Sequence, residues 1–336
     1  MALINVFFEK PLSIKITEEY NVLFARNSIR NYAVSVGFED SELEKIELVV
    51  SELGMNIVKY AKKGILKVSK ISFLQYKGIE ISALDDGPGF DNIIEKVEKK
   101  TPALIGESLG AGLYTIYHLM DEFQVNSQKS NHSMLGTEII VRKWVDIPSF
   151  MKVSAISQPR LGENKNGDIF FIKTLPEYIF FSVIDALGHG DEAALVAKKA
   201  YNFLKIFFYL PLPTIIDELH KLLNNTRGAA ISICKVIPVH QAIEYIGIGN
   251  VDFKVYGSEA KVKAYNYHGT LGMQIESNQH QTFSYNRGST FIMYSDGIAE
   301  HRLEQAQLRL QTQNLANYIM DTYNKKHDDA TILVLR

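Results

Sequence analysis

Four aspartates in the second half of the chain stand beside apolar segments, where they could hold metal ions. The β-branched and aromatic run from Tyr178 to Ile184 predicts a strand buried on both faces, and it ends in Asp185 and the turn Gly188-His-Gly190. Three more aspartates adjoin strand-like runs: Asp168, Asp296 and Asp328. Because an unpaired carboxylate is costly to bury, the four need solvent or a cation, and hard divalent ions prefer oxygen ligands. For any one of them, a turn residue after a strand is an equally good interpretation.

A glutamate and an asparagine four residues apart mark a polar face in the first half. Glu52 and Asn56 lie on a helix that the apolar periodicity predicts from Ser41, with Glu44 as its capping-box partner, to Gly64. Residues four apart project from one side of a helix, so the two side chains lie one turn apart on the same face. A solvated helix face is the plainer interpretation of such a pair.

Two glycine-containing segments follow. A predicted strand from Ile79 ends in Asp85, and Gly87 and Gly89 let the backbone turn sharply beside it, so the carboxylate can accept hydrogen bonds from a base-like amine. Farther on, Ser108-Leu-Gly-Ala-Gly112 opens a helix, whose free N–H groups and positive dipole end suit phosphate. Each segment alone is usually a turn. The order of all these motifs along the chain is more informative than any one of them. Glu-x-x-x-Asn comes first, then Asp-x-Gly-x-Gly, then Gly-x-Gly, and last Gly-Thr before the final strand.

This succession resembles the GHKL ATPase family, which has the Bergerat ATP-binding fold. The likeness covers roughly residues 10–145. Three stretches are similar to RsbT-like serine kinases: Ser51-Glu-Leu-Gly-Met-Asn-Ile-Val-Lys-Tyr-Ala61, Asp85-Asp-Gly-Pro-Gly-Phe90 and Leu119-Met-Asp-Glu-Phe123. No histidine-bearing dimerisation helix precedes the motifs, which argues against a histidine kinase.

The resemblance implies a Bergerat-type α/β sandwich that binds ATP with Mg²⁺. Asn56 would hold the magnesium, Asp85 would read the adenine amino group, and Thr137 would support the adenine pocket. Glu52 would orient or deprotonate the attacking hydroxyl. The remaining implied nucleotide contacts are Lys59, Gly87, Gly89, Ser108, Gly110 and Gly112. Family members usually carry a third glycine where Ser108 stands, although a serine hydroxyl can cap the helix and face a phosphate.

The second half resembles the metal-dependent type 2C serine/threonine phosphatases. Five motifs in order carry the likeness over residues 150–336, and the Gly-Ile-Gly-Asn and Gly-His-Gly variants are similar to RsbX-like members of the SpoIIE branch. The motifs are Gly162-Glu-Asn…Gly167-Asp168, Asp185-Ala-Leu-Gly-His-Gly190, Gly247-Ile-Gly-Asn250, Ser295-Asp-Gly297 and Asp328-Asp-Ala-Thr331.

This second resemblance implies an α-β-β-α sandwich with two Mn²⁺ or Mg²⁺ ions. Asp185 would bridge the ions, with Asp296 and Asp328 on one metal and Asp168 and the carbonyl of Ala186 on the other. A water bound between the ions would attack phosphoserine in line. His189, between two glycines, fits a structural role better than that of an acid. The motifs contain no obvious phosphate-clamping arginine, so the partner's surface is expected to supply substrate affinity.

Length and composition indicate a soluble protein of two domains. The chain has 336 residues, 46% hydrophobic and 22% charged, and Val145–Ser149 forms a short joint, so we expect domains at 1–146 and 147–336. A net charge of −2 gives no basic field for nucleic acid or anionic membrane. No apolar run approaches the roughly 20 residues of a membrane span. The single cysteine, Cys234, and the lack of a signal peptide favour the cytoplasm.

Several other elements are expected from periodicity. Helices are predicted at 17–35, 191–208, 214–223 and 300–323, and strands at 65–75, 79–84, 229–237, 260–265 and 281–295, with a turn at Lys77-Gly78 between the first two strands. The stretch 91–107 is a polar segment that leads into the glycine-rich helix start.

The two resemblances together imply a bifunctional serine/threonine kinase and phosphatase. Its expected partner is a STAS-domain, anti-sigma-antagonist-like protein in a bacterial partner-switching pathway, with other regulators of that pathway and a homodimer as further possibilities. One alternative is that the first domain binds a sigma factor or antagonist without phosphorylating it. Another is that it senses ATP and only regulates the phosphatase.

Overall fold

The computed structural model describes residues 10–89, 92–98, 109–130, 133–259, 262–300 and 302–336. The chain divides into two compact units, with the division between Pro148 and Ser149. None of the helices in the described ranges is both long enough and apolar enough to cross a bilayer.

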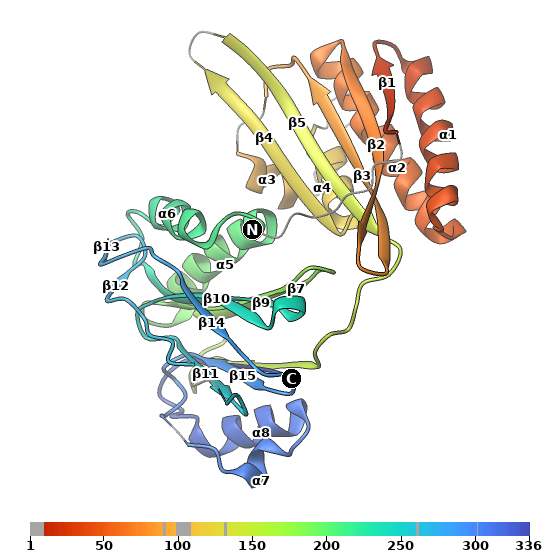
Figure 1. The fold of residues 1–336 in the computed structure, drawn as a ribbon. Coiled ribbons are helices and arrows are strands. Elements are labelled where there is room, and N and C mark those ends of the chain that lie inside the picture. Colours follow the sequence, from red (N-terminus) through yellow and green to blue (C-terminus); the bar gives the residue numbers. More distant parts are fainter. Residues whose placement is uncertain (1–9, 90–91, 99–108, 131–132, 260–261, 301) are drawn as a thin grey trace. The chain divides into compact units, whose positions relative to one another are not determined.

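The first unit is a five-stranded antiparallel sheet with helices gathered on one face (Figure 1). The strand order is β1-β2-β3-β5-β4. The strands are β1 (Leu12–Ile16), β2 (Gly64–Phe73), β3 (Tyr76–Asp85), β4 (Glu122–Ser130) and β5 (Ser133–Trp144); the helices are α1 (Glu19–Val36), α2 (Asp40–Asn56), α3 (Ile93–Glu98) and α4 (Leu109–Leu119). This arrangement is the predicted α/β sandwich.

The helix that carries Glu52 and Asn56 is shorter than predicted. Helix α2 begins after Glu39, so Ser41 lies inside it and forms no side-chain cap. After Asn56 the chain widens into a π-helical turn, Ile57–Ala61, which ends at Lys62 with a φ of 65°. The predicted capping box is therefore wrong, while the face that carries Glu52 and Asn56 is helical as expected.

The hairpin between β2 and β3 turns earlier than predicted. Leu74, with a φ of 53°, forms the turn, and Gly78 lies inside β3 opposite Trp144. A Cβ on Gly78 would lie 2.5 Å from the carbonyl oxygen of Lys143, so this glycine serves close strand packing and not the turn. The prediction of a turn at Lys77-Gly78 is wrong for that reason.

The second unit is a sandwich of two antiparallel sheets with helices on both outer faces (Figure 1). One sheet has the order β14-β10-β9-β8-β7 and the other β11-β15-β16-β6. The strands are β6 (Val153–Gln158), β7 (Asp168–Thr174), β8 (Ile179–Ala186), β9 (Ala229–Ile237), β10 (Ala242–Ile248), β11 (Asp252–Tyr256), β14 (Gln281–Ser284), β15 (Thr290–Tyr294) and β16 (Ala330–Leu335).

Helices α5 (Gly190–Phe207) and α6 (Leu212–Leu222) cover the first sheet, and α8 (Thr312–Tyr323) covers the second; the short helix α7 (Gln305–Leu308), which has no buried residue, precedes α8. This is the expected α-β-β-α sandwich. The core between the sheets includes Phe181, Cys234 and Met293, all fully buried. Burial raises the pKa of the Cys234 thiol well above its ordinary value, so this cysteine serves as a core residue, as predicted.

Three predicted elements differ from the structure. The run 281–295 forms two strands in different sheets, because the chain reverses at Gly288, whose φ is 84°. The helix predicted over 300–323 is two helices, and α8 starts at the buried Thr312, which accepts a hydrogen bond from Ser154 in β6. No strand forms in the described part of 260–265; instead the short hairpin β12 (Gly269–Thr270) and β13 (Gln274–Ile275) follows it.

Candidate active sites

In the first unit, the polar face of α2 lies against helix α4. A Cβ placed on Gly112 would lie 2.6 Å from Oε2 of Glu52 and 3.7 Å from Oδ1 of Asn56. The structure therefore brings Glu52, Asn56 and Gly112 together, as predicted. Gly110 and Gly112 lie inside α4 and not in a loop before it, so the approach to Glu52 is what requires a glycine at position 112.

Asp85 ends strand β3 at a crowded corner of the sheet. It lies opposite Gly64 in β2 and Thr137 in β5, and its Oδ1 accepts a hydrogen bond from the Gly87 N–H at 2.8 Å. Burial raises the pKa of Asp85, while hydrogen bonds from the backbone of Gly87 and Thr137 oppose that rise. One carboxylate oxygen is thus fixed by the glycine turn that the sequence predicted.

The other predicted nucleotide contacts are scattered around this corner. Thr137 is buried beside Asp85, Gly89 adopts a φ of 75°, and Lys59 is exposed on the π-helical turn after Asn56. Ser108 lies outside the described residues. The predictions named Gly136 only as part of the Gly-Thr motif and gave it no role; a Cβ there would lie 1.5 Å from the carbonyl oxygen of Asp85. Its place before Thr137 was the available signal.

In the second unit, the predicted metal-binding aspartates gather at one edge of the sandwich. Asp168 and Asp185 are direct cross-strand partners in β7 and β8. From the other sheet, Ser295 donates a hydrogen bond to Oδ2 of Asp168 and accepts one from the Thr331 N–H at 2.9 Å. Because Asp296 follows Ser295 directly, and Asp328 shortly precedes Thr331, both sheets deliver their acids to the same edge.

The carboxylates at this edge repel one another. Burial, opposed by hydrogen bonds from Ser295 and Thr331 and reinforced by Asp329 and Asp296, raises the pKa of Asp168 to about 7. Burial and then the charges of four neighbouring aspartates, led by Asp168, raise the pKa of Asp185 to about 9. The pKa of Asp296 is raised by burial and by Asp328. Such a cluster is stabilised by either protons or cations.

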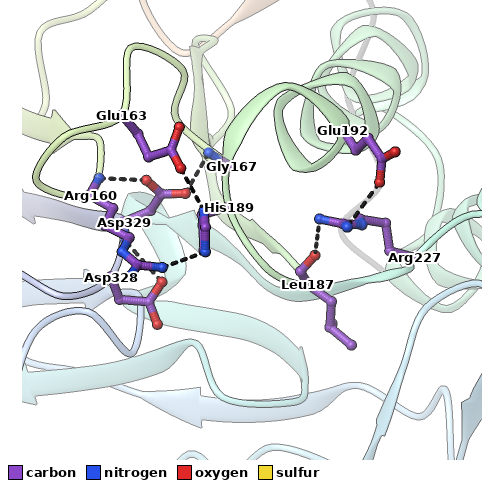
Figure 2. A network of polar contacts seen from close by, with 9 residues as sticks. All are labelled: Arg160, Glu163, Gly167, Leu187, His189, Glu192, Arg227, Asp328 and Asp329. Carbon is purple, nitrogen blue, oxygen red and sulfur yellow. Dashed lines mark hydrogen bonds and ion pairs between the residues drawn. The ribbon is translucent and has the colours of Figure 1, made fainter.

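Asp329 is a site residue that the predictions did not assign. It is buried, and its two carboxylate oxygens accept hydrogen bonds from the N–H groups of Arg160 and Gly167, both at 2.7 Å (Figure 2). Its own N–H donates to Oδ1 of Asp328 at 2.9 Å. Asp329 therefore holds the 160–167 loop against Asp328. Two features of the sequence could have pointed to Asp329: the repeated acid in Asp328-Asp329 and the polar loop that ends in Gly167.

Asn250 and His189 complete the polar edge. Asn250 donates from Nδ2 to Oδ2 of Asp296 at 2.6 Å, at the end of the Gly-Ile-Gly-Asn motif. His189 caps the start of α5, with Nδ1 2.8 Å from Oε1 of Glu163 and Nε2 against the Arg160 guanidinium (Figure 2). These contacts give His189 two protein partners, in agreement with the structural role expected for it.

The first unit matches known kinases in sequence. Residues 17–143 match the family model described as a histidine kinase-like ATPase domain. The chain is 36% identical over 132 residues to the serine/threonine-protein kinase RsbT of Bacillus subtilis, a match that covers 39% of this chain and 95% of RsbT.

The second unit matches phosphatases. Residues 176–336 match the family model of stage II sporulation protein E, SpoIIE. The chain is 27% identical over 138 residues to the phosphoserine phosphatase RsbX of Bacillus subtilis, covering 41% of this chain and 69% of RsbX. The crystal structure of RsbX in complex with magnesium shares the fold, with a TM-score of 0.51 and 21% identity over 56% of this chain and 96% of that one.

The chain belongs to the RsbT-type kinase family, with a SpoIIE domain fused to it.

The donor set in the SpoIIE domain fits a divalent metal. It consists of oxygen ligands, which Mg²⁺ and Mn²⁺ prefer. Oδ1 of Asp168 is buried and has no hydrogen-bond partner among the described residues, so one acceptor is left for a cation. Within the described ranges, no three acidic, histidine or cysteine side chains already stand around one point as metal ligands would. The acids are gathered at one edge but not closed around an ion.

The polar face of the RsbT-type domain fits a nucleotide with its metal. Nδ2 of Asn56 is buried and has no hydrogen-bond partner in the part of the chain that the structure describes. A half turn of the side-chain amide exchanges the positions of its nitrogen and its oxygen. In the turned amide, the oxygen would take the buried position and could coordinate a cation. Asn56 is thus a polar group that a bound ligand could satisfy.

Proposed function

We propose that the protein both phosphorylates and dephosphorylates serine or threonine on a partner protein. The RsbT-type domain transfers phosphate from Mg-ATP, and the SpoIIE domain removes it. The observation that carries the proposal is the gathering of Asp168, Asp185 and the acids of the second sheet at one edge. The kinase half is supported by the approach of Glu52 and Asn56 to Gly112.

In the SpoIIE domain, Asp168, Asp185 and the Ala186 carbonyl would hold one metal ion, and Asp185, Asp296 and Asp328 the other. When bound, the ions supply an activated water and positive charge against the phosphoryl oxygens. Asp329 keeps Asp328 and the 160–167 loop in place through its three backbone contacts. Asn250 orients the Asp296 carboxylate.

In the RsbT-type domain, Glu52 would orient or deprotonate the attacking hydroxyl, and Asn56 would hold the magnesium of the nucleotide. Asp85 accepts hydrogen bonds from the backbone of Gly87 and Thr137 and would accept a further one from the adenine amino group. Thr137, buried opposite Asp85, closes the pocket beneath the base. Lys59, Gly110 and Gly112 contact the phosphates.

The proposed partner is a STAS-domain protein in a bacterial partner-switching pathway. The support is the joining, in one chain, of domains similar to the kinase RsbT and the phosphatase RsbX. Both activities are directed at the same kind of residue, so the phosphorylation state of the partner would depend on ATP, metal and partner concentration. The charge of −2 and the absence of a spanning helix in the described ranges are compatible with a protein partner.

The test uses purified full-length chain, candidate STAS proteins and labelled ATP. Wild type should label the partner and, in excess Mn²⁺ or Mg²⁺, release the label as phosphate. Asn56→Ala should remove labelling but still release phosphate from partner that wild type has labelled beforehand, whereas Asp185→Asn should spare labelling and remove release. Phosphate release that survives Asp185→Asn would contradict the phosphatase half. Binding of ATP without transfer to any partner would leave the first domain as a binding or sensing module.

A further inference from the structure

An arginine outside the motifs lies at the acidic edge of the SpoIIE domain. Asp185 and Ala186 pair with Ala230 and Ala229 at the start of β9, so Arg227, two residues before that strand, lies at the same end of the sheet. Backbone hydrogen bonds hold the two residues that follow Arg227 in place. The Leu187 N–H donates to the Gly228 carbonyl at 3.1 Å, and Ala229 exchanges hydrogen bonds with Leu271 next to the β12–β13 hairpin.

The guanidinium of Arg227 crosses the loop that follows Asp185 (Figure 2). Its Nη1 would lie 2.8 Å from a Cβ on Gly188 and donates to the Leu187 carbonyl at 3.5 Å. Its Nη2 is 2.9 Å from Oε2 of Glu192 in the first turn of α5. The Arg227 side chain is 40% exposed and that of Glu192 is 76% exposed.

The pairing with Glu192 is easily exchanged for another anion. An ion pair this exposed contributes only about 0–1 kcal/mol, because water screens it. A phosphate monoester carries more charge than a carboxylate and matches the planar fork of arginine with two parallel hydrogen bonds. Arg160, across the same loop, has its guanidinium against His189. Arg227 is therefore the better placed of these two arginines to receive an incoming anion.

We propose that Arg227 binds the phosphate of the phosphoserine or phosphothreonine substrate, and that Glu192 occupies the guanidinium until substrate displaces it. The inference rests on the phosphatase half of the proposed function. It adds a residue outside the motifs to the expectation that the partner's surface supplies substrate affinity. Arg227 contributes affinity and Glu192 competes with substrate, so the two residues have opposite effects although they form one ion pair.

The test compares Arg227→Gln, Arg227→Lys and Glu192→Gln in the full chain with bound metal, on a phosphorylated partner and on p-nitrophenyl phosphate. Arg227→Gln should raise KM about tenfold or more, with kcat changed much less, and should weaken inhibition by inorganic phosphate similarly. Arg227→Lys should restore part of the affinity. Glu192→Gln should lower KM and the inhibition constant of phosphate by about twofold to fivefold.

The proposal predicts that Arg227→Gln raises KM and that Glu192→Gln lowers it. This difference in direction separates the proposal from an ion pair that is only structural. If the pair only stabilised the loop, Arg227→Gln and Glu192→Gln would change KM and the unfolding temperature in the same direction, and the inference would be wrong. Lys221→Gln, which breaks the exposed pair with Glu218 on α6, is the matched control and should leave KM unchanged. Wild type without metal-dependent phosphate release would instead refute the phosphatase function itself. An active wild type with an unaltered KM in Arg227→Gln would refute the inference alone.

Discussion

Asp168 and Asp185 face each other as direct partners across β7 and β8, each at the end of its strand. Little else offsets their charge. Ser295 donates to one oxygen of Asp168, and the other oxygen is buried without a partner among the described residues. The edge that is proposed to bind metal is therefore destabilised when it holds neither protons nor cations, and stability becomes a measure of the site.

Asp185→Asn should stabilise the metal-free chain while removing phosphatase activity. At pH 8 the folded chain must keep Asp185 protonated, below its raised pKa of about 9, whereas the unfolded chain lets it ionise; asparagine is neutral in both states, so we expect about 1 kcal/mol or more of added stability. Phosphate release should fall by at least about a hundredfold, because the shared ligand is lost. Thermal unfolding in chelator and a phosphate assay in metal measure the two effects. Asp191→Asn, an exposed change in the first turn of α5, should produce neither.

The stability of the metal-free chain should fall as the pH rises from about 4 to about 9. The folded pKa values of Asp168 and Asp185, about 7 and about 9, lie above the ordinary 3.8, so the folded state binds more protons through this window. The stabilising effect of these bound protons on the folded state is complete below the unfolded pKa and is lost as the pH rises through the folded pKa values of Asp168 and Asp185. Chemical denaturation in chelator at several pH values measures it. If the free energy of unfolding of wild type fell no more steeply with pH than that of Asp185→Asn, the raised pKa assigned to Asp185 would be wrong.

Metal affinity of the SpoIIE domain should rise over the same pH range. Protons and cations compete for the same carboxylates, so binding releases protons until Asp168 and Asp185 are ionised. Calorimetry in two buffers of different ionisation enthalpy gives the number of protons released at pH 7. Release of about one proton or more is expected, and none would place the metal elsewhere.

Asp329→Ala should destabilise the SpoIIE domain and weaken metal binding. It leaves the N–H groups of Arg160 and Gly167 without their acceptor, at a cost of about 2 kcal/mol or more. Asp329→Asn keeps one acceptor oxygen and should lose less. Because Asp329 acts through Asp328, metal affinity should fall before kcat at saturating metal does. An unchanged metal affinity in a folded Asp329→Ala protein would remove it from the site.

Gly112→Ala should abolish nucleotide binding and leave the phosphatase intact. The new methyl group would lie 2.6 Å from the Glu52 carboxylate, so either α4 or Glu52 must move. We expect ATP affinity to fall by at least about tenfold, as for a core clash of this size. A fluorescent ATP analogue measures binding, and phosphate release by the same chain is the internal control. Normal ATP binding would show that α4 does not contact the nucleotide.

The sequence motifs predicted which side chains meet, but not what holds them there. Alternating and continuous apolar runs were enough to locate β7, β8 and α2, and hence the placement of Asp168, Asp185 and Asn56. Asp329 escaped prediction because its role depends on backbone N–H groups more than 160 residues away in sequence. Arg227 escaped for a similar reason, since only the pairing of β8 with β9 carries it to Asp185.

Two of the errors arise where a glycine serves packing and not chain reversal. Gly78 and Gly112 both allow a backbone or carboxylate to approach, and local sequence does not separate this use from a turn. Conversely, Leu74 forms its turn with a positive φ that a leucine rarely adopts. Whether such a residue lies in a turn or inside a strand or helix is decided by tertiary contacts.

Ser295 lies on one layer of the sandwich and donates to Asp168 on the other. This hydrogen bond ties the two sheets together at the acidic edge, so any shift of one sheet against the other would act on Asp168 directly. The spacing of the acids thus depends on how the whole sandwich is packed, and not on the local loops alone.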